Sequence, residues 1–380
     1  MMTRIVLLVL DGFGIGSLPD AESYGDAGCN TLQRLAAISK GLTLPNLEQL
    51  GLGLLGQFQG IRPMAQPEGC YGVLGFTTKG KHSLAGHWEL AGYVIEDGPT
   101  SYDTFTSELA SGLEAALGQK TLGNCRTVHL EPIAEFGAEH QKSGMPIAWI
   151  DTAGTIMLAA HEQVVPPEEL YRLAREARRL LKATMPVVRV VAYPFVGQPG
   201  RFAVTERRRD FAVEPAGLTL LDHLSQASQL VFGVGKVGDL FSGRGVTRSV
   251  PLYQTPSVMD EVIGMFSKAP RGLIYANLPI MSPDLQDTVS TLQHVDRRLR
   301  DLQEHLKVGD VLSIRGPRNA FPLVLPGVAD GRDSSAKHLR FVAGGIGITP
   351  ILPMLSHAER LGYDWSAIYT GRSRASLPFL

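Results

Sequence analysis

The residues best suited to chemistry lie in one short segment, residues 81–89, which reads KHSLAGHWE and combines a hydroxyl, two imidazoles and a carboxylate. Ser83 stands where the N-cap of a helix would stand, and Gly86 lets a ligand approach the backbone closely. An anion beside Ser83 would be held by the unpaired amide groups of the starting helix. From this segment alone, a structural N-cap serine beside a packed histidine is an equal alternative.

A carboxylate far upstream favours the chemical interpretation. Asp11 ends the apolar run of residues 5–10, which predicts a buried strand, and a glycine-rich turn follows at residues 12–16. Open α/β sheets bind ligands at the carboxyl ends of such strands. Carboxylates bind hard divalent cations, and a metal ion can activate a serine. Asp11 and Ser83 together therefore predict phosphoryl transfer, which requires the two side chains to meet in the folded chain.

Both segments resemble the phosphopentomutase family of the alkaline phosphatase superfamily. Residues 9–16, VLDGFGIG, are similar to the opening of that family, and residues 80–89 to its nucleophile loop, whose phosphorylated residue is normally threonine. The resemblance covers roughly residues 1–278. Further matching segments follow in order at residues 159–162, 194–197, 208–212, 235–237 and 272–278.

The resemblance implies an isomerase, an intramolecular phosphotransferase that interconverts (deoxy)ribose 1-phosphate and 5-phosphate. Ser83 would be the phosphorylated residue, and Asp11 would bind Mn²⁺, of which the family uses two ions. Thr152, Arg208 and Lys236 occupy positions that would hold the sugar phosphate, and the planar fork of arginine suits that role. The alternative for residues 207–209 is a surface loop in which two of the three arginines pair with neighbouring acids.

The implied fold is a parallel-rich α/β core with an inserted α/β cap domain that closes over the metal. Residues 1–99 would form the first part of the core, residues 100–215 the cap, and residues 216–278 the second part of the core. Residues 279–380 would form a different, reductase-like segment. The α/β class of the core and cap agrees with apolar strands that alternate with helical patterns along the chain.

Several positions depart from the family. Gly154 stands for an aspartate and Tyr193 for an arginine, which leaves the pentose specificity open. The Asp-His segments that supply most of the remaining metal ligands are not found after residue 278, so Asp11 is the one ligand visibly kept. A two-metal site needs several carboxylate and imidazole ligands. The sequence therefore predicts an incomplete core and leaves activity open.

The segment after residue 278 resembles part of a different family, the phthalate-dioxygenase-type reductases. Residues 305–323 are similar to the end of their flavin domain, and residues 338–350 to the Rossmann-like turn that holds NAD(P) pyrophosphate. The alternatives to a mutase are therefore an NAD(P)-binding or flavin-binding reductase fragment, or a non-catalytic fused or truncated remnant. The residues of the predicted nucleotide site are Gly344, Gly345, Gly347 and Thr349.

Composition limits the classes of partner. The 36 Lys and Arg residues nearly balance the 37 Asp and Glu residues, which argues against nucleic acid or an anionic membrane as a partner and leaves a small sugar phosphate. Three widely spaced cysteines fit a reducing compartment. No apolar run reaches the roughly 18 residues of a membrane span, and the N-terminal run is too short for a signal peptide. We expect a cytoplasmic protein of undetermined oligomeric state.

Periodicity predicts the elements that position these residues. In the helix expected at 167–184, acidic residues open the first turn, and we interpret its later basic residues, Arg175, Arg178, Arg179 and Lys182, as a solvated face. Strands at 310–314 and 339–343 could replace lost core strands, although the sequence leaves open whether they dock on the core. We also expect strands at 4–11, 146–150 and 186–193, and helices at 31–39, 45–50, 103–117 and from residue 83 to about 94.

Overall fold

The computed structural model forms two compact units. The larger unit contains the described residues from Arg4 to Lys307 together with strand β11 (Val311–Arg315). The smaller unit contains β12 (His338–Gly344) and β13 (Asp364–Thr370), which pair in parallel. The structure describes residues 4–80, 82–95, 104–127, 130–151, 154–184, 187–282, 284–307, 310–315, 338–344 and 364–370.

The central sheet of the larger unit is parallel throughout and has the strand order β11-β1-β10-β8-β9. Strands β1, β8 and β10 are mostly apolar because helices cover both faces of the sheet. The register sets Val9 opposite Asn277 and Asp11 opposite Pro279. Asp11 and Asn277 therefore lie on neighbouring strands at the carboxyl edge of the sheet. The strands are β1 (Arg4–Asp11), β8 (Val231–Val234), β9 (Arg248–Val250), β10 (Gly272–Pro279) and β11.

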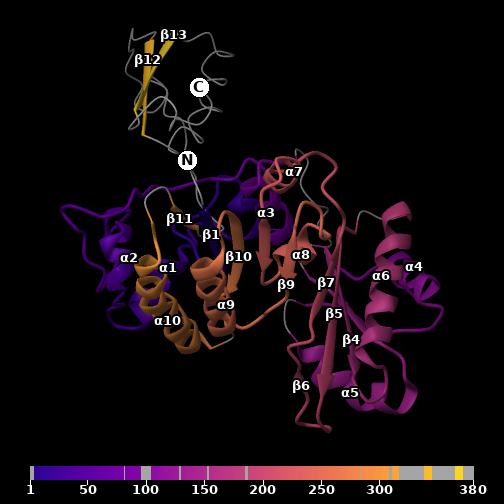
Figure 1. Ribbon diagram of the computed structural model, residues 1–380. Helices are drawn as coiled ribbons and strands as arrows, with labels where there is room; N and C mark the ends of the chain where they lie inside the picture. Colours follow the sequence, from indigo (N-terminus) through magenta and orange to yellow (C-terminus); the bar gives the residue numbers. More distant parts are fainter. Residues whose placement is uncertain are drawn as a thin grey trace. The chain divides into compact units, whose positions relative to one another are not determined.

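Two layers of helices enclose this sheet, because successive side chains of β1 point to opposite faces. Leu8 and Leu10 face a layer of α1 (Thr31–Ile38), α2 (Pro45–Gln49), α9 (Thr255–Lys268) and α10 (Leu285–Glu304). Leu7 and Val9 face α3 (Ser83–Leu90), α7 (Leu220–Gln226) and α8 (Val237–Leu240). Figure 1 shows both layers. Short 3₁₀ turns lie at Ala21–Tyr24 and Leu52–Leu54.

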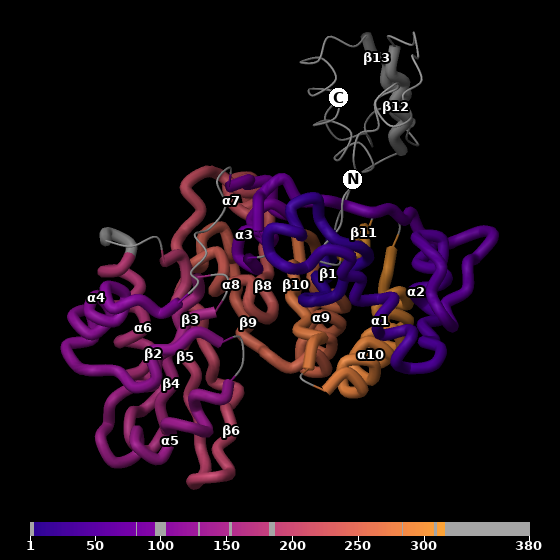
Figure 2. Tube along the Cα trace, turned by 180° about the vertical axis from the view of Figure 1, so that it is seen from behind, coloured from indigo at the N-terminus to yellow at the C-terminus, as the bar shows by residue number. Residues whose placement is uncertain are grey.

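A second, mixed sheet has the order β2-β3-β4-β5-β6, and β7 also pairs with β5. Helices α4 (Ser107–Leu117) and α6 (Pro167–Thr184) pack on one face, and α5 (Glu131–Ser143) packs on the other (Figure 2). All its strands fall inside the range predicted for the cap, whose boundaries stay predictions. They are β2 (Leu122–Arg126), β3 (Ile147–Ile150), β4 (Thr155–His161), β5 (Arg189–Val196), β6 (Ala203–Val204) and β7 (Arg209–Ala212).

The two C-terminal strand predictions have different outcomes. The strand expected at 310–314 is β11, which docks on the central sheet with Ile5 opposite Val311. The strand expected at 339–343 is β12, which pairs with β13 in the other unit. The edge of β1 that an incomplete core would expose is therefore covered by β11.

Among the helices that the structure describes, none combines the length and the apolar character that a membrane span requires.

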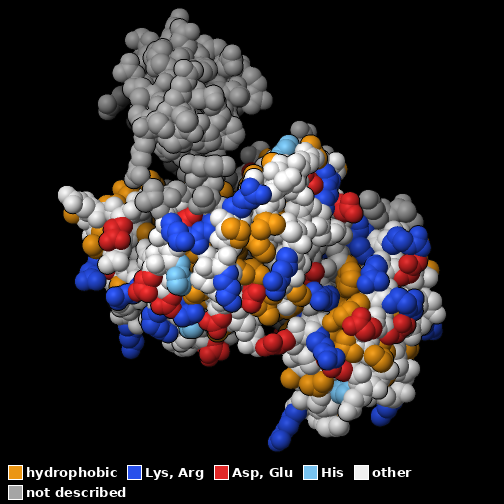
Figure 3. Space-filling view, in the orientation of Figure 1, with side chains coloured by type: hydrophobic (Ala, Val, Ile, Leu, Met, Phe, Trp, Pro, Cys, Tyr) orange, Lys and Arg blue, Asp and Glu red, His pale blue; other side chains and the backbone are white. Residues whose placement is uncertain are grey.

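Helix α6 confirms the solvated-face interpretation only in part. Arg172 pairs with Glu169 at 2.7 Å, and Arg179 pairs with Glu176 at 2.6 Å, all with exposed side chains. In this region Figure 3 shows basic and acidic side chains interspersed on the surface. Arg178 differs, because it is only 6% exposed and its Nε and Nη1 atoms have no hydrogen-bond partner among the described residues.

Candidate active site

Asp11, Asn277 and Lys236 meet at the carboxyl edge of the central sheet. Asp11 ends β1, and its carboxylate forms an ion pair with the Lys236 ammonium group. Lys236 is brought there by Gly235, whose φ is +76° and whose added Cβ would lie 2.4 Å from the Asn277 carbonyl oxygen. Only glycine combines that backbone conformation with so close an approach. The Gly235 turn thus fixes the lysine beside the aspartate.

Ser83 is the first residue of α3, not its N-cap as expected. His82 is the N-cap, because its side chain accepts the Leu84 N–H at 3.1 Å, and the helix ends at Leu90 rather than near residue 94. The Ser83 Oγ is buried and has no hydrogen-bond partner within the described part of the chain. A free hydroxyl on the first turn of a helix is well placed to carry an anionic group.

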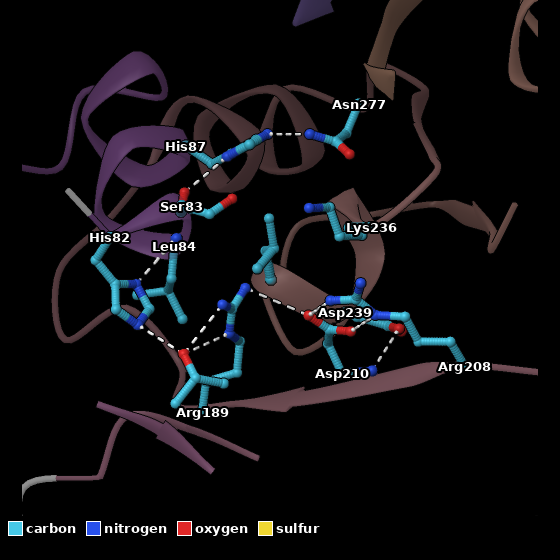
Figure 4. A network of polar contacts seen from close by, with 12 residues as sticks. His82, Ser83, Leu84, His87, Arg189, Arg208, Asp210, Lys236, Asp239 and Asn277 are labelled. Carbon is cyan, nitrogen blue, oxygen red and sulfur yellow. Dashed lines mark hydrogen bonds and ion pairs between the residues drawn. The ribbon is translucent and has the colours of Figure 1, made fainter. Parts of the chain in front are cut away.

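His87 connects Ser83 to Asn277 (Figure 4). Its Nδ1 lies 2.7 Å from the Ser83 carbonyl oxygen and must donate to it, so Nε2 of the neutral ring accepts from Asn277 Nδ2 at 3.1 Å. The Asn277 amide also contacts Asp11. Ser83 is therefore joined to Asp11 and Lys236 through His87 and Asn277, by its main-chain carbonyl oxygen and not by its hydroxyl. Their chemical roles stay predictions.

Asp210 organises a second cluster next to the first (Figure 4). Its carboxylate accepts two hydrogen bonds from Arg208, at 2.8 and 3.1 Å, and one from Arg189 at 3.3 Å. The Arg208 guanidinium lies 5.0 Å from the centre of the Tyr193 ring and 5.7 Å from that of Tyr253. Arg208 thus pairs with the neighbouring Asp210, as the surface-loop alternative expected, but its side chain is partly buried and lies against two aromatic rings.

Charges determine the ionisation of both clusters. Burial would raise the pKa of Asp11, but the charge of Lys236 and the hydrogen bonds from Lys236 and Asn277 outweigh it and hold that pKa well below its usual range. Asp210 behaves alike, since Arg208 and Arg189 lower its pKa against the effect of burial. Burial lowers the pKa of His87 to about 4, although Asp11 opposes the shift. Both carboxylates are ionised and the imidazole is neutral at neutral pH.

The buried His87 predicts a specific pH dependence of stability. Between its ordinary pKa of 6.5 and its folded value of about 4, the unfolded chain binds the extra proton. The free energy of unfolding should therefore fall by up to about 3 kcal/mol as the pH drops through this window. Urea titrations from pH 7 to 4 measure it. His87→Gln should make the curve less steep, with the remaining slope due to other buried histidines such as His82, and replacing the exposed His223 by glutamine should leave it unchanged.

Part of the predicted site lies outside the described residues. Thr152, the third predicted substrate ligand, is among these, as are Gly345, Gly347 and Thr349 of the predicted nucleotide turn. Gly344 is the last residue of β12.

Sequence reasoning gave no role to Arg189, Asp210 or Asn277, and it did not expect His82 as the N-cap of α3. Asp210 lies in the matched segment 208–212 and Asn277 in the matched segment 272–278, which are usable signals. Nothing in the sequence singles out Arg189.

The described residues do not fit a two-metal centre. No group of three or more His, Cys, Asp or Glu side chains there could hold a metal ion. The carboxylate of Asp11, the predicted metal ligand, is already neutralised by the Lys236 ammonium group. Its other neighbours, Asn277 and the neutral His87, supply no second negative charge. We therefore assign no step to a metal ion.

The curated relatives of this chain come from one family. No protein-family model matches the chain. The phosphopentomutase of Caldanaerobacter subterraneus subsp. tengcongensis is 37% identical over 340 residues, which cover 88% of this chain and 86% of the relative. That of Dictyoglomus turgidum is 39% identical over 320 residues, covering 82% and 81%, and that of Alkaliphilus metalliredigens is 35% identical over 319 residues, covering 82% of each.

A solved structure of Leishmania mexicana phosphoglycerate mutase matches over 84% of both chains, with 12% identity and a TM-score of 0.37, which is too low to support a conclusion. The curated relatives, by contrast, share more than a third of their residues with this chain over more than four fifths of its length. The chain belongs to the phosphopentomutase family.

Proposed function

We propose that the chain interconverts (deoxy)ribose 1-phosphate and 5-phosphate, with Ser83 carrying the phosphoryl group between turnovers. The observation that carries this proposal is the buried, unpartnered hydroxyl of Ser83, a residue that His87 and Asn277 join to Asp11 and Lys236. A hydroxyl without a protein partner is available for a covalent bond, and the Lys236 ammonium group, which pairs with Asp11 in this structure, would bind phosphate oxygens. Family membership at 34–39% identity supports the same chemistry.

The exchange needs two phosphoryl transfers. In the first, the P–O bond of phosphorylated Ser83 breaks as a bond forms to the free hydroxyl of the bound sugar monophosphate, which gives a sugar bisphosphate. In the second, the other phosphoryl group passes back to the Ser83 oxygen and leaves the isomeric monophosphate. Lys236 and Arg208 would neutralise the transferring and the resting phosphate, with Thr152 as a further ligand. Fixed positive charge of this kind supplies most of the catalysis in phosphoryl transfer.

The finer assignments stay part of the proposal. We infer an alkaline-phosphatase-like core, with the second sheet as an inserted cap, in a cytoplasmic protein. Manganese is what the family resemblance implies, and no step above depends on it. The reductase alternative is not favoured, because the curated relatives that cover most of the chain are phosphopentomutases. NAD(P) or flavin binding therefore forms no part of the proposed activity.

Phosphorus NMR tests the proposal directly. The full chain, incubated with ribose 5-phosphate, a trace of ribose bisphosphate and Mn²⁺, should produce ribose 1-phosphate until equilibrium is reached. Mass spectrometry of the same sample should place one phosphoryl group on Ser83. Ribose 5-phosphate that stays unchanged, together with an unmodified Ser83 peptide, would refute the proposed function.

A further inference from the structure

His82 links helix α3, which begins at Ser83, to the second sheet (Figure 4). The residue is only 5% exposed, its Nδ1 accepts the Leu84 N–H at 3.1 Å, and its Nε2 lies 3.4 Å from Thr155 Oγ1. A ring whose Nδ1 accepts a hydrogen bond carries its proton on Nε2 when neutral. Nε2–H therefore donates to the Thr155 hydroxyl, which lies at the start of β4.

A series of hydrogen bonds continues from Thr155 across the second sheet and ends on helix α8. Thr155 Oγ1 also accepts from Arg189 Nη2 at 3.0 Å, and Arg189 Nη1 donates to Asp210 at 3.3 Å. The backbone N–H of Asp210 then donates to the Asp239 carboxylate on α8 at 3.0 Å. These contacts run from the N-cap of α3 through β4, β5 and β7 to α8. Hydrogen bonds therefore join the second sheet to two helices that pack on the central sheet.

Burial favours the neutral form of His82. It lowers the pKa of the ring, and the positive charge of Arg189 lowers it further against the opposing effect of Asp210. A protonated ring would direct an N–H at the Leu84 N–H and break the cap. The neutral Nε2–H form satisfies both contacts at once.

We propose that His82 is a positioning residue for Ser83: Thr155 of the second sheet fixes the imidazole ring, and the ring fixes the first turn of α3 and the direction of the Ser83 hydroxyl. The idea rests on the proposed function of Ser83. It assigns Thr155 and Arg189 the task of coupling the placement of the second sheet to the alignment of the nucleophile. A misaligned nucleophile slows the chemical step more than it weakens substrate binding.

Thr155→Val isolates the coupling, because it removes the hydroxyl and keeps the β-branched shape, while His82 can still cap α3. We expect kcat to fall about 10-fold with KM changed less than about 2-fold. Thr155→Ser should restore kcat. His82→Asn keeps a good capping group but is too short to reach residue 155. In the His82→Asn background, Thr155→Val should have no further effect on kcat. An unchanged kcat in the single variant Thr155→Val would overturn the proposal. Additive losses of kcat in the double variant would overturn it as well.

A second readout does not depend on turnover. Nitrogen-15 NMR of the full chain labelled at histidine should show the Nε2–H tautomer for His82, assigned by its loss in His82→Asn, and Thr155→Val should perturb that signal. A protonated ring or the Nδ1–H tautomer would overturn the coupling whatever the activity. Missing turnover in the unsubstituted chain would instead count against the proposed function, so the two failures are distinguishable.

Discussion

Replacing Ser83 by alanine should abolish phosphoenzyme formation and lower the mutase rate by at least about 10⁴-fold, as expected when a covalent nucleophile is lost. The side chain is small and makes no hydrogen bond that the substitution would break. The fold should therefore survive, and the loss should appear in kcat. Radiolabelled sugar phosphate followed by denaturing electrophoresis measures the phosphoenzyme, and circular dichroism checks the fold.

Two further serine variants control this experiment. Ser83→Thr introduces the residue that the family normally uses and should keep the phosphoenzyme signal. Ser267→Ala alters an exposed serine near the end of α9 and should change nothing. A phosphoprotein signal that persists in Ser83→Ala would remove Ser83 from the mechanism and require another nucleophile.

Replacing Asp210 by asparagine should destabilise the larger unit by about 3–5 kcal/mol, the range for breaking a buried ion pair. Asp210 is only 4% exposed and is the shared partner of Arg208 and Arg189. Asparagine has nearly the same shape but leaves two guanidinium groups without their counter-charge. Urea unfolding at pH 7 measures the loss. Glu176→Gln, which breaks an exposed pair on α6, should cost under about 0.5 kcal/mol.

The same variant has a defined pH signature. The pKa of Asp210 is depressed in the folded chain, so the stabilisation is complete above the ordinary aspartate pKa of 3.8 and is lost as the pH falls through the lower, folded value. The difference between the parent chain and Asp210→Asn should therefore shrink in acid. A difference that stays constant down to pH 2 would mean that Asp210 acts by packing and not by charge.

The elements that could be predicted are those whose signals are local. The apolar run before Asp11 predicted the strand at 4–11, and the acid-to-base helix pattern predicted the helix at 167–184, both with the observed bounds. Family resemblance placed Ser83, Asp11 and Lys236 in a single candidate site, and the structure brings them together. Such features depend on periodicity and on matched segments, which a single sequence displays.

The features that could not be predicted depend on distant partners. Ser83 looked like an N-cap because its type favours that position, yet His82 takes the position with a partner 73 residues away in the chain. The pairing of Arg189 with Asp210 follows from the β5–β7 ladder, whose register a sequence does not display. Arg178 follows the same sequence pattern as the other basic residues predicted to form a solvated face, but tertiary packing buries its side chain.

The position of β1 has a consequence for synthesis of the chain. It is made first, but its two neighbours in the sheet are made last, since Ile5 pairs with Leu273 on one side and Val311 on the other. At a translation rate of roughly 5–20 residues per second, this apolar strand waits on the order of 10 s or more for a partner. Long-range parallel pairing is also slow once the partners exist. We therefore expect the nascent chain to depend on chaperones that shield β1 until both neighbouring strands have been synthesised.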